Sequence, residues 1–296
     1  MELRQLRYFK VVAELQHFHK AAKILCITQP ALSNQIKQLE EELATRLFER
    51  VGRGVRLSES GELVLESARR VLNEIKNMHA AIEDIESGAA GSLRVGVLQS
   101  VNALYLRKIV VDFDRHYPNI SLHIDELPNH QIENQVTLGE IDLGVGFILR
   151  KPYKNIKTEP LFRERWKMVV ALQHEEQISD IMTGKNHGLK AVLLPEYFET
   201  RKIVNSYFED QGIGVSQIIE VNSINYILDL VENGNSFTVL PEAFSVFKAR
   251  HTLVSHYIDA IPPRQVGILT AKDRMQKKSV TKFRELVLSH LSANEN

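Results

Sequence analysis

The chain has 296 residues, enough for two domains or three small ones, which excludes a single small module. Apolar residues make up 44% and charged residues 25%, a globular balance that argues against wholesale disorder and fibrous repeats. Lysine plus arginine and aspartate plus glutamate both number 37, and the resulting net charge of zero argues at face value against a nucleic-acid partner.

Charge is unevenly distributed along the chain. Residues 1–57 carry ten basic and six acidic side chains, residues 58–90 carry three basic and seven acidic ones, and the remainder is balanced at 24 of each. The net charge of zero is therefore the sum of a basic N-terminal segment, an acidic segment after it and a balanced remainder of the chain. It limits the non-specific affinity for DNA without excluding DNA as a partner.

Cysteine content and hydropathy indicate the cellular compartment in which the protein is expected. Cys26 is the only cysteine, so a disulfide framework and a cysteine-rich metal site are excluded. Because no apolar run of 18 residues and no export signal are present, we expect a cytoplasmic protein with no membrane partner. Cys26 lies between Leu25 and Ile27 and is predicted to be a small buried hydrophobe rather than a redox sensor.

Residues 1–58 predict a winged helix-turn-helix domain. Apolar residues three and four apart predict a helix over 3–15, and a second, shorter helix follows over 19–25. A tight turn leads to a third helix, so that the helix-turn-helix spans about residues 18–37. Two short strands around a glycine-rich turn over 48–58 add the wing, with Arg53 at its tip.

The third helix has a clear beginning and two different faces. Thr28 is predicted to be its N-cap, and Pro30 lies in the first turn, where a missing N–H has no partner to lose. The helix is expected to extend to about Glu42. Its predicted buried side carries Ala31, Leu32, Ile36 and Leu39.

Residues 59–88 predict a long linker helix that pairs with a second copy. Apolar residues alternate at spacings of three and four, as in a coiled coil. The predicted dimerisation seam is formed by Leu65, Ala68, Leu72, Ile75 and Ile82. The alternative is a helix packed on its own domain, which the length of the segment and its glycine-rich end disfavour.

Strands and helices alternate from residue 91 to residue 296, which predicts an α/β fold with doubly wound sheets. The length suits two Rossmann-like lobes, similar in arrangement to periplasmic binding proteins. We expect lobe I over about 91–162 plus 266–296, and lobe II over about 163–265. The chain thus crosses between the lobes twice.

Motifs in both halves resemble the LysR-type bacterial transcriptional regulators. The N-terminal residues that carry the resemblance include Phe9, Ala21-Ala22, Thr28-Gln29-Pro30-Ala31-Leu32-Ser33 and Leu39-Glu40. The second half adds Gly91-Ser-Leu-Arg-Val-Gly96, Tyr117-Pro118 and Leu240-Pro241. Glu199-Thr-Arg201 with Asn222-Ser-Ile224 is most similar to the branch of cyanate-operon regulators. The resemblance implies a homotetramer, built as two dimers, that binds promoter DNA and activates or represses transcription in response to an effector.

The polar face of the third helix and the wing carry the candidate DNA contacts. A protein that recognises a sequence in duplex DNA needs polar side chains at the base edges and cationic side chains beside the phosphates. We expect Gln29, Ser33 and Asn34 at base edges and Lys37 and Thr28 at phosphates. The full set is Thr28, Gln29, Pro30, Ser33, Asn34, Lys37 and Arg53. An ordinary solvated face is the alternative, and the winged pattern and the resemblance disfavour it.

A cleft between the two lobes is the expected effector site, because ligands of such sheets bind beyond the carboxyl ends of the strands. Helix N-termini there and the charge of Arg201 predict a small polar ligand, anionic rather than cationic. The candidates are Ser100, Asn102, Asn129, Phe147, Thr200, Arg201 and Asn225. Ser100 and Thr200 can equally be helix caps, and Phe147 can be part of the core.

Catalytic motifs are missing from the sequence. We find no nucleotide-binding loop and no nucleophile elbow, and the eleven histidines form no set at metal-ligand spacing. We therefore expect no enzyme activity, no metal and no cofactor. The alternative is a small-molecule-binding protein or an enzyme on the same two-lobed scaffold, since a fold does not determine its function.

Overall fold

The computed structural model describes residues 1–52, 54–86, 91–148, 155–185, 188–245, 252–272, 274 and 276–292. The chain divides into two compact units: residues 1–91 with the short segment 137–140, and residues 92–136 with 141–296. Among the described residues, no helix combines the length and the apolar character needed to cross a bilayer.

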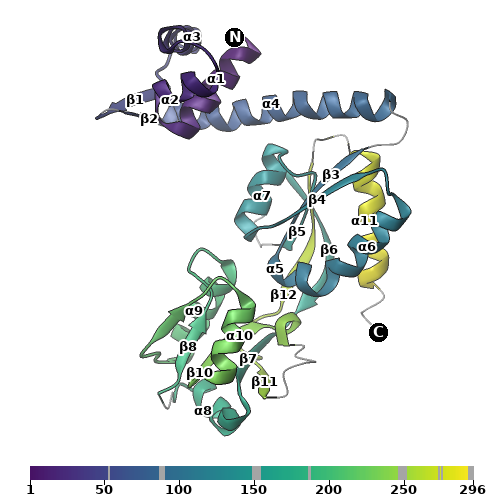
Figure 1. Ribbon diagram of the computed structural model, residues 1–296. Coiled ribbons are helices and arrows are strands. Elements are labelled where there is room, and N and C mark those ends of the chain that lie inside the picture. The colour runs from purple at the N-terminus through teal and green to yellow at the C-terminus, as the bar shows by residue number, and fades with distance from the viewer. Residues whose placement is uncertain are drawn as a thin grey trace. The chain divides into compact units, whose positions relative to one another are not determined.

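The N-terminal unit begins with the predicted winged helix-turn-helix, which is confirmed (Figure 1). Its elements are α1 (Leu3–Leu15), α2 (Phe18–Ile24), α3 (Gln29–Glu42), β1 (Phe48–Val51) and β2 (Gly54–Leu57). The Thr28 hydroxyl accepts a hydrogen bond from the Ala31 backbone N–H at 3.4 Å, as an N-cap does. Strands β1 and β2 pair in antiparallel register to form the wing.

Ala21 and Ala22 are buried in the core of this domain, where α2 packs against α1 and α3. The predicted burial of Leu32, Ile36 and Leu39 is confirmed, whereas that of Ala31 is wrong because it lies at the solvent side of the first turn of α3.

The burial predicted for Cys26 is also wrong, since the residue is exposed. Its φ of 55° places it in the left-handed region. Its neighbours Leu25 and Ile27 pack against the core. With both of them directed inward, the turn directs Cys26 toward solvent.

Helix α4 (Glu59–Glu86) packs on its own domain along its first half, where three residues of the predicted dimerisation seam lie. Ala68 is 1% exposed within the core of the same chain, and Leu65 and Leu72 pack against that core. The apolar spacing along α4 does not by itself show which face of the helix packs on its own domain and which face is open to a partner.

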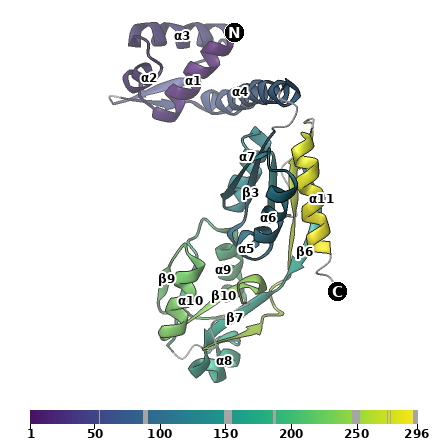
Figure 2. The same cartoon turned by 45° about the vertical axis from the view of Figure 1, so that its right-hand side comes forward.

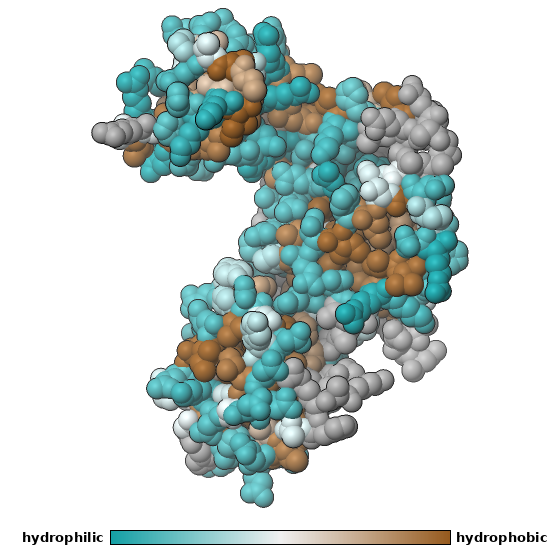
Figure 3. All heavy atoms as spheres, viewed as in Figure 1, coloured by the Kyte–Doolittle hydropathy of each residue, from teal (hydrophilic) through white to brown (hydrophobic). Residues whose placement is uncertain are grey.

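The second half of α4 carries a different apolar stripe. Val71, Met78 and Ile82 are 42%, 53% and 46% exposed, and Ile75 between them is half-buried. The spacing of these four residues is four, three and four, which is the period of a coiled-coil seam. Figure 3 shows apolar atoms interrupting the hydrophilic surface along this helix. The four residues are called the α4 stripe below.

Lobe I of the C-terminal unit is a five-stranded sheet in the order β4-β3-β5-β12-β6. The strands are β3 (Ser92–Val97), β4 (Ser121–Glu126), β5 (Leu143–Phe147), β6 (Ile156–Glu164) and β12 (Arg264–Ala271). Strand β3 is parallel to β4 and β5, and β12 is antiparallel to β5 and β6. Helices α6 (Arg107–His116) and α11 (Lys278–Ser292) cover one face and α7 (Asn129–Leu138) covers the other (Figures 1 and 2).

Lobe II is a second five-stranded sheet, in the order β11-β7-β10-β8-β9. The strands are β7 (Trp166–Ala171), β8 (Lys190–Leu193), β9 (Ile218–Glu220), β10 (Ser236–Pro241) and β11 (Leu253–Tyr257). Successive residues of β7 pack on opposite faces: Met168 and Val170 contact the core under α8 (Ile178–Met182) and α9 (Glu199–Gln211), and Val169 contacts the core under α10 (Ile224–Asn233). Both faces of this sheet are thus covered, as in other α/β folds.

The chain crosses between the lobes twice. Strand β6 ends at Glu164 and β7 begins at Trp166, while the return runs through residues 258–263 into β12 at Arg264. The predicted two-lobed α/β fold is therefore confirmed. Both crossings place charged side chains where the lobes meet.

Candidate functional site

The exposed face of α3 carries the predicted DNA contacts. Thr28, Gln29, Pro30, Asn34 and Lys37 are exposed, and Ser33 is half-buried. Within the part of the chain that the structure describes, no hydrogen bond involves the side chains of Gln29, Ser33 or Asn34. Their donors and acceptors are therefore available to a ligand. Arg53 lies outside the described residues.

Helix α3 is hydrogen-bonded to the start of the wing. The Glu40 carboxylate accepts hydrogen bonds from the backbone N–H groups of Leu47, at 2.7 Å, and Phe48, at 3.3 Å. Across the hairpin, Arg56 pairs with Glu49 at 3.1 Å. Glu40 lies in the last turn of α3 and carries no sequence signal for this role. The Glu40 hydrogen bonds join the last turn of α3 to the first residues of the wing, and the Arg56–Glu49 pair joins the two strands of the wing.

The second candidate site is a cleft of about 170 Å³ between the two lobes. Lobe I contributes Leu98, Gln99, Ser100, Glu126, Leu127, Pro128 and Phe147, and lobe II contributes Leu194, Phe198, Thr200, Asn222, Ile224 and Phe244. The volume is below the roughly 300 to 1,000 Å³ of pockets for drug-sized molecules, so the cleft suits a smaller ligand. Its walls are mostly apolar, with a few polar groups.

Three of the predicted effector residues, Ser100, Phe147 and Thr200, line this cleft. Asn129 is not among the residues that line the cleft, and its amide is hydrogen-bonded inside lobe I. Its Oδ1 accepts a hydrogen bond from the Phe147 N–H at 2.6 Å, and its Nδ2 donates to the Phe147 carbonyl and to Glu133, both at 3.3 Å. Asn129 thus holds the backbone of Phe147 in place.

Arg201 does not line the cleft either, and its charge is used within lobe II. The guanidinium is buried and donates to the Leu194 carbonyl, to Glu220 at 2.7 Å and to Asn205 at 2.8 Å. These contacts give the anionic ligand inferred from this arginine no support, and the charge of the effector stays a prediction.

The two remaining candidates lie outside the lining. Asn102 donates to Glu126 at 2.7 Å and so orients a carboxylate that does line the cleft. Asn225 is exposed on α10, because the helix turns it away from its neighbours Asn222 and Ile224, which line the cleft.

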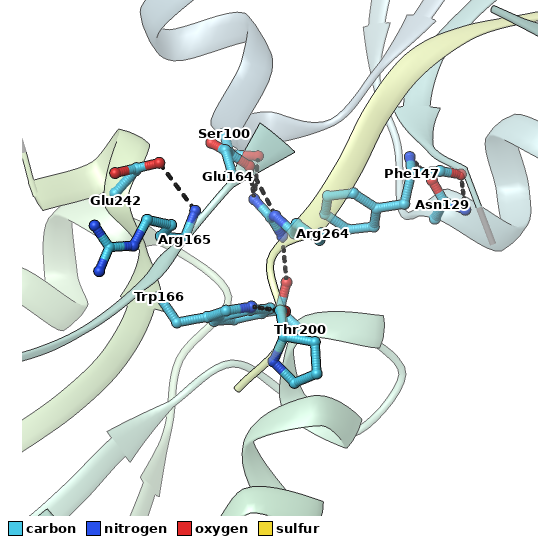
Figure 4. A network of polar contacts seen from close by, with 10 residues as sticks. Ser100, Asn129, Phe147, Glu164, Arg165, Trp166, Thr200, Glu242 and Arg264 are labelled. Atoms are coloured by element: carbon cyan, nitrogen blue, oxygen red, sulfur yellow. Dashed lines mark hydrogen bonds and ion pairs between the residues drawn. The ribbon is translucent and has the colours of Figure 1, made fainter. Parts of the chain in front are cut away.

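A buried arginine that the sequence analysis missed lies where the lobes meet (Figure 4). Arg264 donates to Glu164 from Nε at 2.7 Å, and its Nη2 lies 2.6 Å from the same oxygen. It also donates to the hydroxyl of Ser100 at 3.2 Å and to that of Thr200 at 3.3 Å. Its guanidinium carbon lies 3.9 Å from the centre of the Phe147 ring. These contacts with Ser100, Thr200 and Glu164 are called the Arg264 network below.

A second buried acid, Glu133, lies on α7 next to Asn129. Burial raises the pKa of Glu133 from 4.5 to about 7, and the nearby Glu199 carboxylate adds to the increase. Because the folded-state pKa is the higher one, the folded protein binds more protons than the unfolded chain between pH 4.5 and about 7. The stability that this group contributes is complete below that window and is lost as the pH rises through it.

We therefore expect Glu133→Gln to raise the unfolding free energy by about 1 to 2 kcal/mol at about pH 8, and to change it little at about pH 5. Urea titrations at both pH values measure this difference. The exposed Glu176→Gln is the control and should have no effect at either pH. A loss of stability in Glu133→Gln at both pH values would contradict the assignment.

The described residues hold no group of three or more histidine, cysteine, aspartate or glutamate side chains placed to bind a metal ion. A winged helix-turn-helix with an open polar face, followed by a two-lobed α/β unit with a cleft, defines a class of protein: a DNA-binding regulator with a domain for a small molecule.

The chain belongs to the LysR family of bacterial transcriptional regulators. Residues 3–62 match the bacterial regulatory helix-turn-helix protein of the lysR family, and residues 86–292 match the LysR substrate binding domain. This is a family of regulators and not of enzymes. The resemblance to the cyanate branch stays a prediction.

Relatives match over most of the chain. The HTH-type transcriptional regulator XapR of Escherichia coli is 31% identical over 252 residues, which covers 82% of this chain and 83% of XapR. The uncharacterized HTH-type transcriptional regulator YybE of Bacillus subtilis is 27% identical over 293 residues, 99% of this chain and 100% of YybE.

Solved structures of full-length regulators share the fold. The crystal structure of CbnR, a LysR family transcriptional regulator, has a TM-score of 0.68 at 20% identity and covers 98% of this chain and 99% of its own. That of full-length BenM has a TM-score of 0.58 at 26% identity, with 99% and 97% covered.

Proposed function

We propose that this regulator binds promoter DNA through the exposed face of α3 and the wing, and that a small polar effector in the cleft modulates the output. The open donors and acceptors of Gln29, Ser33 and Asn34, on a helix that Glu40 joins to the wing, are the observation that carries the DNA assignment. As a DNA-binding regulator it would act in the bacterial cytoplasm and would have no enzyme activity of its own.

The base-edge and phosphate contacts are expected to respond differently to substitution. Asn34→Ala should weaken binding to the promoter about tenfold to a hundredfold and leave binding to a scrambled duplex unchanged, because a base contact carries sequence information. Lys37→Ala should weaken binding to both duplexes and lower the slope of log affinity against log salt.

Fluorescence anisotropy with the intergenic DNA beside the gene, over a series of salt concentrations, measures both effects. Lys76→Ala removes an exposed cation from α4 and is the matched control for Lys37. Arg53→Ala tests the wing: it should weaken promoter binding and lower the salt slope, and an unchanged slope would contradict the predicted role of the wing. If the unsubstituted protein fails to bind this DNA even at low salt, the alternative of an enzyme on the same scaffold is favoured.

We further propose that the protein assembles as a dimer through the α4 stripe, and as a tetramer built from two dimers. In the dimer, two copies of α3 can bind two DNA half-sites. More phosphates are then neutralised, and once the first α3 is bound, the second binds its half-site as an intramolecular step.

A further inference from the structure

Two carboxylates from different lobes lie close together beside the cleft. Glu133 lies on α7 of lobe I, and Glu199 is the first residue of α9 of lobe II. Pro128, which precedes α7, and Thr200, which follows Glu199, both line the cleft, so the first turns of the two helices approach each other there. The negative charge of Glu199 acts on Glu133 across the boundary between the lobes.

The Glu133 side chain is largely removed from water. It is 2% exposed, and Nδ2 of Asn129 donates to its Oε1 at 3.3 Å. The neighbouring Ile132 packs against Gly144 of β5 in the apolar core of lobe I, which supplies no charge to offset a carboxylate. An ionised Glu133 is therefore a buried charge in mostly apolar surroundings, which is costly.

The charged groups around Glu133 come from both lobes. In lobe II, Glu199 is 24% exposed, and its Oε1 accepts a hydrogen bond from Nζ of Lys202 at 2.6 Å. In lobe I, Glu126 is exposed at the cleft, and His130, the other titratable residue of α7, is also exposed. Beyond the effect of burial, Glu199 is the group whose charge raises the pKa of Glu133.

The position of the lobes and the protonation of Glu133 are linked. Burial raises the pKa of Glu133 from 4.5 to about 7, and Glu199 adds to the increase. If the lobes separate, both causes weaken and the pKa falls back toward 4.5. A proton is therefore bound more tightly when the lobes are together than when they are apart. From about pH 8 to about pH 6, the ratio of joined to separated lobes should increase about tenfold.

We propose that Glu133 and Glu199 form a proton-dependent latch between the lobes, which makes the arrangement of the α/β unit respond to pH near neutrality. With Glu133 protonated, its hydroxyl donates to the Glu199 carboxylate and the lobes are held together. Loss of the proton leaves two carboxylates at the boundary, and their repulsion separates the lobes about the two crossings. This latch needs no ligand, so it acts on the cleft in addition to the effector.

Distances between spin labels on the two lobes test the latch on the full chain. The labels are attached through Lys157→Cys in lobe I and Gln211→Cys in lobe II, both exposed positions, in a Cys26→Ser background that removes the native thiol. Labelled chains are mixed with an excess of unlabelled chain, so that only distances within one chain are measured. Double electron–electron resonance should show a joined and a separated population whose ratio changes about tenfold between about pH 8 and about pH 6.

Substitutions of the two acids distinguish the latch from general effects of pH. Glu133→Gln should keep the joined arrangement at both pH values, because the amide donates to Glu199 and does not ionise. Glu199→Gln should reduce the change and move its midpoint to lower pH, because one cause of the raised pKa is removed. Glu209→Gln removes an exposed carboxylate of the same helix α9 and is the matched control, which should keep the full change.

The latch is contradicted if the two populations keep the same ratio at both pH values, or if Glu133→Gln retains the pH dependence. It is supported if the pH dependence disappears in Glu133→Gln and survives in Glu209→Gln. Circular dichroism at both pH values checks that each variant is folded, and Glu133→Gln is expected to be at least as stable as the unsubstituted protein. The distances are measured without DNA, so they test the latch independently of the promoter contacts.

Discussion

Glu164→Leu is expected to lower the unfolding free energy of the α/β unit by about 3 to 5 kcal/mol, because it leaves the charge of Arg264 buried without its counter-ion. Glu164 is 1% exposed and Arg264 is 7% exposed, so water cannot take over from the missing carboxylate. Urea denaturation followed by the fluorescence of Trp166 measures the change, and this indole lies 5.2 Å from the Arg264 guanidinium carbon.

The double variant Glu164→Leu with Arg264→Met should recover most of that loss. Replacing both partners of a buried pair by apolar residues is often neutral, and here it also removes Oε1 of Glu164, which has no hydrogen-bond partner among the described residues. Glu159→Leu breaks a pair that is about one-third exposed and should cost less than about 1 kcal/mol. A double variant as unstable as the single one would show that the pair contributes through packing rather than charge.

The winged helix-turn-helix was predictable because its signals are local. A cap at Thr28, a proline in the first turn and an apolar period of three and four each depend on residues close together in sequence. The same holds for most helices of the α/β unit. Strand β6 has a weaker local signal because Pro160 interrupts it, which an edge strand of a sheet tolerates.

The Arg264 network was not predictable, because it joins residues 100, 164, 200 and 264. The arginine that the sequence places at a helix start, Arg201, forms its contacts inside its own lobe. The relevant arginine begins a strand directly after two prolines. Arg264, and not Arg201, contacts the cleft residues because the two crossings between the lobes place it there.

Three residues of the predicted seam of α4 pack on the core of the winged domain. Leu65, Ala68 and Leu72 follow the coiled-coil period, but the same period serves a helix packed on its own domain. The stripe that stays open begins at Val71, and it shares Ile75 and Ile82 with the predicted seam. The position of the core of the winged domain determines which of these two faces of α4 is buried and which is exposed.

Val71→Glu with Met78→Glu is therefore expected to convert the protein to a monomer, since two charges would be placed within an apolar seam. Promoter affinity should fall about a hundredfold or more, because the second half-site contact is no longer intramolecular. Sedimentation velocity measures the assembly, and anisotropy with the promoter duplex measures the affinity.

Two single variants on the same helix separate assembly from folding. Lys76→Glu changes an exposed charge outside the stripe and should leave the dimer intact. Leu72→Glu should instead destabilise the winged domain, because this side chain packs against that domain's own core. A protein that carries both stripe substitutions and still sediments as a dimer would contradict the role of α4, and dissociation by Leu72→Glu without loss of stability would restore the seam first predicted.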